Sequence, residues 1–260
     1  MIWAQRRKLS YMTGLLTFLF VVSFLVFQSS TKVVPTCFDN KKNGGESGVD
    51  CGGTCLSYCP NELSDPKVRW VRSFEISPGI VHSIAYIEHS YPASSSRGAR
   101  YVFKLYDDKN SLITEKEGVT YLGPMGRSAI VENLIQTGNS KVALTRFAFL
   151  PPITWEKSDP AFSQVVIKTD RNLLEAFEGG LRLTATLENK SRYSFENIDV
   201  VAILYDENDN AINVSKILLP SISGLSNQTV YFTWPEKTDP KSIRTIEIIP
   251  RINPFKSSEI

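Results

Sequence analysis

The sequence predicts an all-β fold: two tandem antiparallel β-sandwiches, plus one N-terminal transmembrane helix and a small disulfide-rich module. Three observations carry this prediction. A long apolar stretch without charge lies near the N-terminus, all four cysteines fall in residues 37–59, and runs of alternating apolar and polar residues recur about 100 residues apart in the remainder. With 260 residues, the chain can bury a separate core in each of two domains.

The apolar stretch predicts a transmembrane helix at residues 11–29. No charged residue occurs from Leu9 to Thr31, and about 20 helical residues are enough to cross a hydrocarbon layer of ~30 Å. A basic tail, residues 1–10, precedes the helix and carries Arg6-Arg7-Lys8. Because basic residues favour the cytoplasmic side, we expect a single-pass cell-membrane protein with a cytoplasmic N-terminus and extracytoplasmic C-terminal domains. The lipid bilayer is then a partner of residues 11–29.

A cleaved signal peptide is the competing interpretation of this segment, since it also combines a basic start with an apolar stretch. No Ala-x-Ala-like triplet follows Phe27, and the apolar stretch is longer than the usual signal-peptide core of about 7–15 residues. A retained anchor is therefore favoured. Both interpretations export the rest of the chain.

Residues 30–62 form a predicted Cys-rich stalk module. Its cysteines are Cys37, Cys51, Cys55 and Cys59. Their even number and close spacing in an exported segment predict two disulfides, with three pairings possible. A structural zinc site is the alternative, but the spacing lacks the Cys-x-x-Cys pairs that such sites use. The segment is too short to bury a core, so crosslinks have to hold its shape.

Oxygen-bearing side chains between the first two cysteines make calcium the one candidate cofactor. Asp39, Asn43, Glu46 and Asp50 combine carboxylate and amide oxygens with nearby glycines, as calcium loops do. Lys41, however, stands where an EF-hand loop supplies an oxygen. The alternative, which the pattern favours, is that these residues are ordinary turn formers in a disulfide loop. We expect no other cofactor.

The stretch Asn43-Gly-Gly-Glu-Ser-Gly-Val-Asp-Cys-Gly-Gly-Thr-Cys55 resembles a short cysteine motif of bacterial surface proteins, the DCGGxC type, which lies near the membrane or between domains. The resemblance implies a cell-surface location and says nothing about catalysis.

The remainder predicts a first β-sandwich at residues 63–152 and a second at residues 153–260. Tyr101-Val-Phe-Lys-Leu-Tyr-Asp107 recurs as Val200-Val-Ala-Ile-Leu-Tyr-Asp206, and a polar turn and another apolar run follow each copy. This is the pattern of a β-hairpin in two copies of one fold. Several short strands at such spacing predict an antiparallel sandwich. One short helix is expected around Asn172–Phe177.

The second copy contains Leu187-Glu-Asn-Lys-Ser191, Ile203-Leu-Tyr-Asp206 and Asn210-Ala-Ile212. It resembles the FxLYD group of small β-sandwiches, relatives of the water-stress and late-embryogenesis domains. The first copy keeps Lys104-Leu-Tyr-Asp107 but has His89 where the second has asparagine. The resemblance implies an extracellular, non-enzymatic, adhesive or scaffolding use.

The residue pattern does not predict an enzyme. His82 and His89 are the only histidines, and neither lies in a catalytic or zinc-binding spacing. Residues 1–32 hold four of the 29 basic residues and no acidic one, which leaves 25 basic against 27 acidic residues. Such a balance provides no field for nucleic acid.

We therefore expect a membrane-anchored extracytoplasmic binding or scaffolding protein of the cell envelope, without catalytic activity. Its expected partner is another envelope protein or a surface polymer. The alternative is a structural subunit of a membrane machine or surface appendage, assembled partly through its transmembrane helix.

Overall fold

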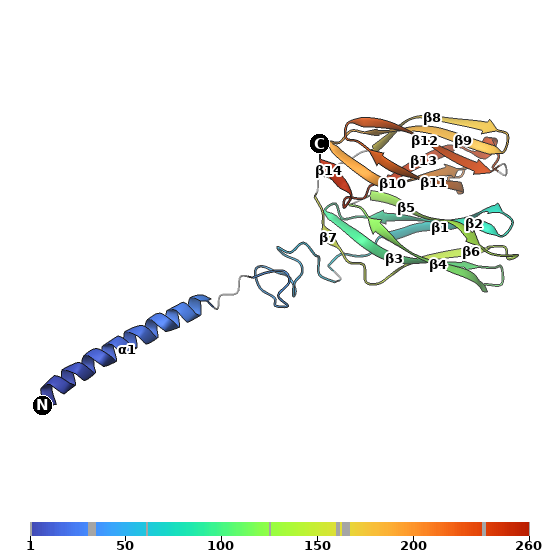
Figure 1. Ribbon diagram of the computed structural model, residues 1–260. Coiled ribbons are helices and arrows are strands. Elements are labelled where there is room, and N and C mark those ends of the chain that lie inside the picture. The colour runs from blue at the N-terminus through green and yellow to red at the C-terminus, as the bar shows by residue number, and fades with distance from the viewer. Residues whose placement is uncertain are drawn as a thin grey trace. The chain divides into compact units, whose positions relative to one another are not determined.

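The computed structural model describes residues 2–30, 35–60, 62–124, 126–159, 162, 167–235 and 238–259. The chain divides into two compact units, Met1–Cys55 and Leu56–Ile260. The second unit contains all of the strands, so both sandwiches belong to one unit (Figure 1).

The first unit opens with helix α1 (Ile2–Ser30). Its stretch Gln5–Gln28 is long enough and apolar enough to cross a membrane, and none of it is buried in the protein. The predicted helix is thus present, and the basic tail is helical as well. Thr13 and Thr17 donate their hydroxyl hydrogens to the main-chain oxygens of Leu9 and Thr13, at 2.8 Å each. Intrahelical bonds therefore satisfy these hydroxyl donors.

The second unit is built from four antiparallel sheets, which confirms the predicted fold class. The first sandwich packs one sheet of β1 (Lys67–Ser77), β2 (Ile80–His89) and β5 (Gly126–Gln136) against another of β4 (Leu112–Leu122), β3 (Ser94–Tyr106) and β6 (Leu144–Leu150), with β7 (Glu156–Lys157) paired to β3. The second packs β12 (Ser226–Pro235), β9 (Gly180–Asn189) and β8 (Ile167–Phe177) against β11 (Ala211–Ile222), β10 (Tyr193–Tyr205) and β13 (Thr245–Arg251), with β14 (Ser257–Glu259) paired to β10. A 3₁₀ turn, η2 (Pro240–Ser242), precedes β13.

The helix expected around Asn172–Phe177 is absent, because these residues belong to strand β8. They pair with β9, and Leu174 lies opposite Leu183. Leu174 also packs against the core of the second sandwich. Pairing with a distant strand and burial of alternate residues thus override the local helical pattern.

The first sandwich extends past its expected end at residue 152. Trp155 is 5 % exposed and packs in the core of the first sandwich. Strand β7 pairs with β3, and Glu156 also forms a β-bridge with Ser57. The main-chain N–H of Tyr58 donates to the oxygen of Trp155 at 2.9 Å. The end of the predicted stalk module therefore packs on the first sandwich.

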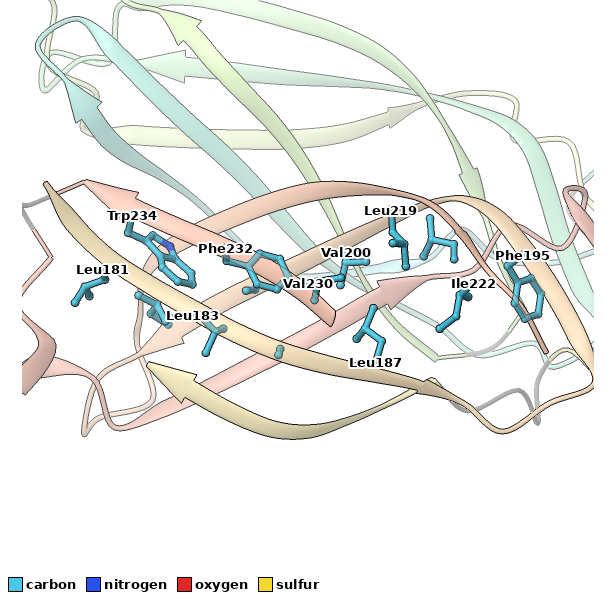
Figure 2. Close-up of a cluster of buried hydrophobic side chains, with 14 residues drawn as sticks. Leu181, Leu183, Leu187, Phe195, Val200, Leu219, Ile222, Val230, Phe232 and Trp234 are labelled. Carbon is cyan, nitrogen blue, oxygen red and sulfur yellow. The ribbon is translucent and has the colours of Figure 1, made fainter. Parts of the chain in front are cut away.

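Three hydrophobic cores separate the four sheets. Two lie inside the sandwiches. Figure 2 shows the core of the second, with Leu181 and Trp234 at one end and Phe195 at the other. The third, the middle core, lies between the two sandwiches, where sheet β1-β2-β5 faces sheet β11-β10-β13. Its buried residues are Ile84, Tyr86, Ala129, Val131, Val201, Ile203, Ala211, Val214 and Ile249. The two sandwiches are therefore packed layers of one body.

The repeated Leu-Tyr-Asp sequence has a structural explanation. Leu105 and Leu204 are fully buried in the two sandwich cores. Asp206 follows strand β10, and its Oδ1 accepts hydrogen bonds from the main-chain N–H groups of Asn208 and Asn210, at 2.9 and 2.8 Å. These bonds, the one from Asn210 above all, lower the pKa of Asp206. Asp107 caps the turn after β3 in the same way. The aspartates thus fix hairpin turns.

Candidate functional site

The cysteines form the predicted disulfides. Cys37 and Cys55 are bonded, with their Cα atoms 5.7 Å apart. Cys51 and Cys59 are disulfide-bonded too, and no cysteine is free among the described residues. Glu46 lies near the sulfurs of Cys37 and Cys55, but sulfurs in a disulfide are not thiolates and do not bind zinc.

The four calcium candidates lie close together in the disulfide loop, where the carboxylates of Asp39, Glu46 and Asp50 bind groups of the loop itself, whereas the buried Oδ1 of Asn43 has no hydrogen-bond partner among the described residues. Asp50 accepts hydrogen bonds from the main-chain N–H groups of Asp39 and Asn40, at 3.0 and 2.9 Å. Glu46 Oε2 accepts from the N–H groups of Asn43 and Asp50, at 3.3 and 3.2 Å. Asp39 Oδ2 accepts from the Asn43 side chain at 2.8 Å, the bond that contributes most to lowering the pKa of Asp39. A calcium ion would have to compete with these donors, and calcium binding stays a prediction.

One glycine of the Cys-Gly-Gly-x-Cys stretch is dictated by space. Gly53 has a φ of +54°, and a Cβ placed on it would lie 1.9 Å from the main-chain oxygen of Gly45. No other residue fits this close approach. The glycine pattern therefore reflects the tight folding of the loop.

Polar contacts fix the two sandwiches to each other around the middle core. The hydroxyls of Tyr86 and Tyr205 donate to the two carboxylate oxygens of Glu247, at 2.8 and 2.9 Å. Burial, together with these bonds, raises the pKa of both tyrosines. Trp70 stacks on Tyr86 with ring centroids 5.2 Å apart. Residues from both sandwiches thus share one hydrogen-bonded cluster.

A buried arginine forms a second such cluster. Arg251 is 6 % exposed and lies on β13 of the second sandwich. It donates to Asp199 of its own sandwich at 3.1 Å, and to the Ser128 hydroxyl and the Tyr121 main-chain oxygen of the first, at 3.1 and 3.0 Å. Its positive charge is paired and its hydrogen bonds are made, as a buried charge requires. These contacts hold the sandwiches at a fixed angle.

The outer sheet of the first sandwich, β4-β3-β6, is covered by charges. Lys104 pairs with Glu115, and Arg100 with Glu117, at 3.2 Å each. In the second sandwich the corresponding sheet lies against the middle core. There Ile203 pairs with Val214, and these two positions correspond to Lys104 and Glu115 of the first sandwich.

The outer sheet of the second sandwich, β8-β9-β12, has threonines in the middle of strands β9 and β12, and Arg182 and Glu188 of β9 carry charge toward its two ends. We call this surface the threonine face. It consists of Thr184, Thr186, Thr229 and Thr233 together with Leu173 and Tyr231. Leu173 and Tyr231 are 55 % and 59 % exposed. Exposed apolar and aromatic side chains gathered on a sheet are typical of a binding surface.

Register explains why one sheet is buried and its counterpart is exposed. In the first sandwich Ile84 pairs with Val131, and Tyr86 pairs with Ala129. In the second, Thr184 pairs with Tyr231, and Thr186 pairs with Thr229. Each of these positions is 100 residues later. The apolar set supplies the middle core, and the threonine set faces solvent.

His89 and Ser94 are a pair that sequence analysis did not identify. His89 ends β2, as expected of a strand-end residue, and its Nε2 lies 2.9 Å from Ser94 Oγ. Both are buried, and Trp155 stacks on the imidazole with centroids 4.5 Å apart. In the second sandwich Asn189 occupies the same place and bonds to the main-chain oxygens of Tyr193 and Ser223. The pair therefore holds a strand end.

Burial makes His89 a source of acid sensitivity. It lowers the pKa of His89 from 6.5 to about 4. The unfolded chain therefore binds a proton below pH 6.5 that the folded chain accepts only near pH 4, so stability falls as pH drops through this window. We expect His89→Asn, which introduces the side chain present at position 189, to remove this part of the acid sensitivity. Unfolding in urea at pH 7, 6, 5 and 4 measures it; equal pH slopes for both proteins would contradict the assignment.

A cavity of about 190 Å³ lies beside this pair, between the two sandwiches. His89, Tyr121, Arg127 and Arg251 are among its lining residues. The Tyr121 hydroxyl donates to the main-chain oxygen of Arg251 at 2.5 Å, and burial raises the pKa of Tyr121 to about 12. Tyr121 and Arg251 thus already serve the contact between the sandwiches.

Comparison with known proteins does not assign the chain to a family. No protein-family model matches it, and no curated protein matches it. Among solved structures it is similar to the N-terminal CBM22-1-CBM22-2 tandem domain of Paenibacillus barcinonensis Xyn10C, with 6 % identity and a TM-score of 0.16 over 76 % of this chain and 89 % of that one. A likeness at this level carries no argument about function.

Proposed function

We propose that this chain is a membrane-anchored extracytoplasmic binding or scaffolding protein of the cell envelope, without catalytic activity. The observation that carries the proposal is the threonine face, an exposed sheet surface rich in threonine that also presents Leu173 and Tyr231, on a body whose two sandwiches are packed together. Helix α1 supports a membrane anchor, and the disulfides support an oxidising compartment.

The threonine face suits a partner that offers hydrogen-bonding groups, either another envelope protein or a surface polymer. Rows of short hydroxyl side chains offer hydrogen bonds without a large loss of side-chain entropy, and Tyr231 adds an aromatic contact. The charged outer sheet of the first sandwich lacks such residues at its centre, since Lys104 and Glu115 pair with each other there. The two outer sheets are therefore a binding face and a matched control.

Site-specific photo-crosslinking in cells of the source organism tests the proposal. A photoreactive side chain replaces Tyr231 in one variant and Lys104 in the other, each in the full chain. We expect a discrete crosslinked product from position 231 and none from position 104. No product from either position, or the same product from both, would contradict a binding role for the threonine face. Digestion by protease added to intact cells checks the extracytoplasmic location.

The same crosslink distinguishes this proposal from the alternative, in which the chain is a subunit assembled through its transmembrane helix. Replacing α1 by an unrelated transmembrane helix leaves the sandwiches unchanged. We expect the product at position 231 to persist after this exchange. Its loss, with the protein still in the membrane, would favour assembly through the helix.

A further inference from the structure

We propose that the disulfide loop, residues 35–55, docks on the bilayer that holds helix α1, with Phe38 inserted among the lipid headgroups. The inference rests on the proposed membrane anchoring and adds a second membrane contact to it. Phe38 is 88 % exposed, the highest value among the exposed large hydrophobic residues of the described chain. A phenylalanine so placed lacks any burial within its own unit.

The loop holds Phe38 in this exposed position. Its neighbour Cys37 is crosslinked to Cys55, and on the other side the N–H groups of Asp39 and Asn40 donate to the carboxylate of Asp50. Asn40 adopts a left-handed φ of +57°, which turns the chain directly after this clamp. Since both flanks are fixed, the backbone of Phe38 is held at the surface of the loop.

Two lysines close to Phe38 can pair with lipid phosphates, in a loop that also holds three carboxylates. The carboxylates of Asp39, Glu46 and Asp50 accept hydrogen bonds from groups of the loop. Lys41 and Lys42 are exposed, and neither takes part in a salt bridge found among the described residues. Exposed aromatic rings and exposed lysines both anchor proteins at membrane interfaces.

Chain length brings the membrane within reach of the loop. The apolar span ends at Gln28, ten residues before Phe38. Ten extended residues cover at most roughly 35 Å. A tether this short keeps the loop at high effective concentration near the headgroups, so a weak contact is enough to seat it.

Tryptophan fluorescence in lipid nanodiscs tests the docking. Phe38→Trp is made in the full chain, and the wild-type spectrum is subtracted to remove the native tryptophans. The discs contain phosphatidylcholine and phosphatidylglycerol, with bromine atoms on shallow acyl positions in one set. We expect the added emission to be blue-shifted and mostly quenched by the brominated lipid. Tyr231→Trp, an exposed residue of the second sandwich, is the matched control and is expected to escape quenching.

Two results for the fluorescence of position 38 would overturn the docking. Emission from position 38 could match tryptophan in water, or it could be blue-shifted yet unquenched, which would mean that protein covers the residue. Reversing the charge of both lysines, with Lys41→Glu and Lys42→Glu together, is expected to reduce the quenching at low salt. An unchanged signal would show that the lysines do not contribute to the docking. Flotation of the same samples separates the two proposals: a chain that floats but shows no quenching refutes the docking alone, and one that does not float with lipid refutes the anchoring as well.

Discussion

Ile203→Asp is expected to open the contact between the two sandwiches and to lower the free energy of unfolding by about 3–5 kcal/mol. Ile203 is fully buried in the middle core, opposite Val214 on one neighbouring strand and Glu247 on the other. A carboxylate there lies beside the existing carboxylate of Glu247. It must be buried unpaired, be neutralised, or drive the two sheets apart.

Lys104→Asp is the matched control. Lys104 occupies on β3 of the first sandwich the position that Ile203 occupies on β10 of the second, and it lies on the charged outer sheet. There the new carboxylate lies next to Arg146 on β6, and we expect a change within about 1 kcal/mol. Urea unfolding of the full chain in detergent micelles measures both variants. Equal costs for the two would show that the middle core does not hold the sandwiches together.

The second large effect is expected from removal of the Cys37–Cys55 disulfide. Replacing both cysteines by serine releases a crosslink between residues 18 apart, which corresponds to about 3 kcal/mol of loop stability. The loop has no apolar core to compensate. The loss should be confined to residues 35–55, since the sandwiches have cores of their own.

Hydrogen exchange resolves this effect by residue. The N–H groups of Asp39 and Asn40 are bonded to Asp50, and we expect their protection to disappear in the double variant. Amides of β10 provide the internal reference and should exchange as in the wild type. Protection that survives at Asp39 and Asn40 would mean that the hydrogen bonds alone keep the loop folded.

Much of the fold could be predicted because its signals are local. An uncharged stretch long enough to cross a membrane forms helix α1. Alternation along residues 181–188 places Leu181, Leu183 and Leu187 in the core of the second sandwich, as the period of two requires. Aspartates after the Leu-Tyr pairs predicted hairpins, and both turns occur.

The wrong prediction at Asn172–Phe177 shows where local signals end. A short apolar run can fit a helix or a strand, and only its pairing with β9 decides. The middle core did leave a signal in the sequence. Residues 200–204 are apolar without alternation, which is typical of a strand buried on both faces. Two separate sandwiches would have left one of those faces in water.

The site residues were predictable only in part. Composition and spacing predicted the oxidation of the four cysteines, whereas the pairing of Cys37 with Cys55 follows from three-dimensional proximity. The threonine face required the register of β9 and β12, because its members are distant in sequence. The pairing of His89 with Ser94 likewise depends on the turn between β2 and β3.

The contact between the sandwiches joins two unlike sheet faces, so it is heterologous and does not close on itself. Repeated from chain to chain, it would produce an open-ended fibre. The free ends carry the Lys104–Glu115 pair on one side and Thr184 and Thr186 on the other, where the internal contact has apolar side chains. These polar residues prevent a further chain from packing on either outer sheet in the way that the two sandwiches pack on each other. Apolar substitutions at both ends would therefore carry the hazard of linear growth, which a search for stabilising surface mutations in this chain should avoid.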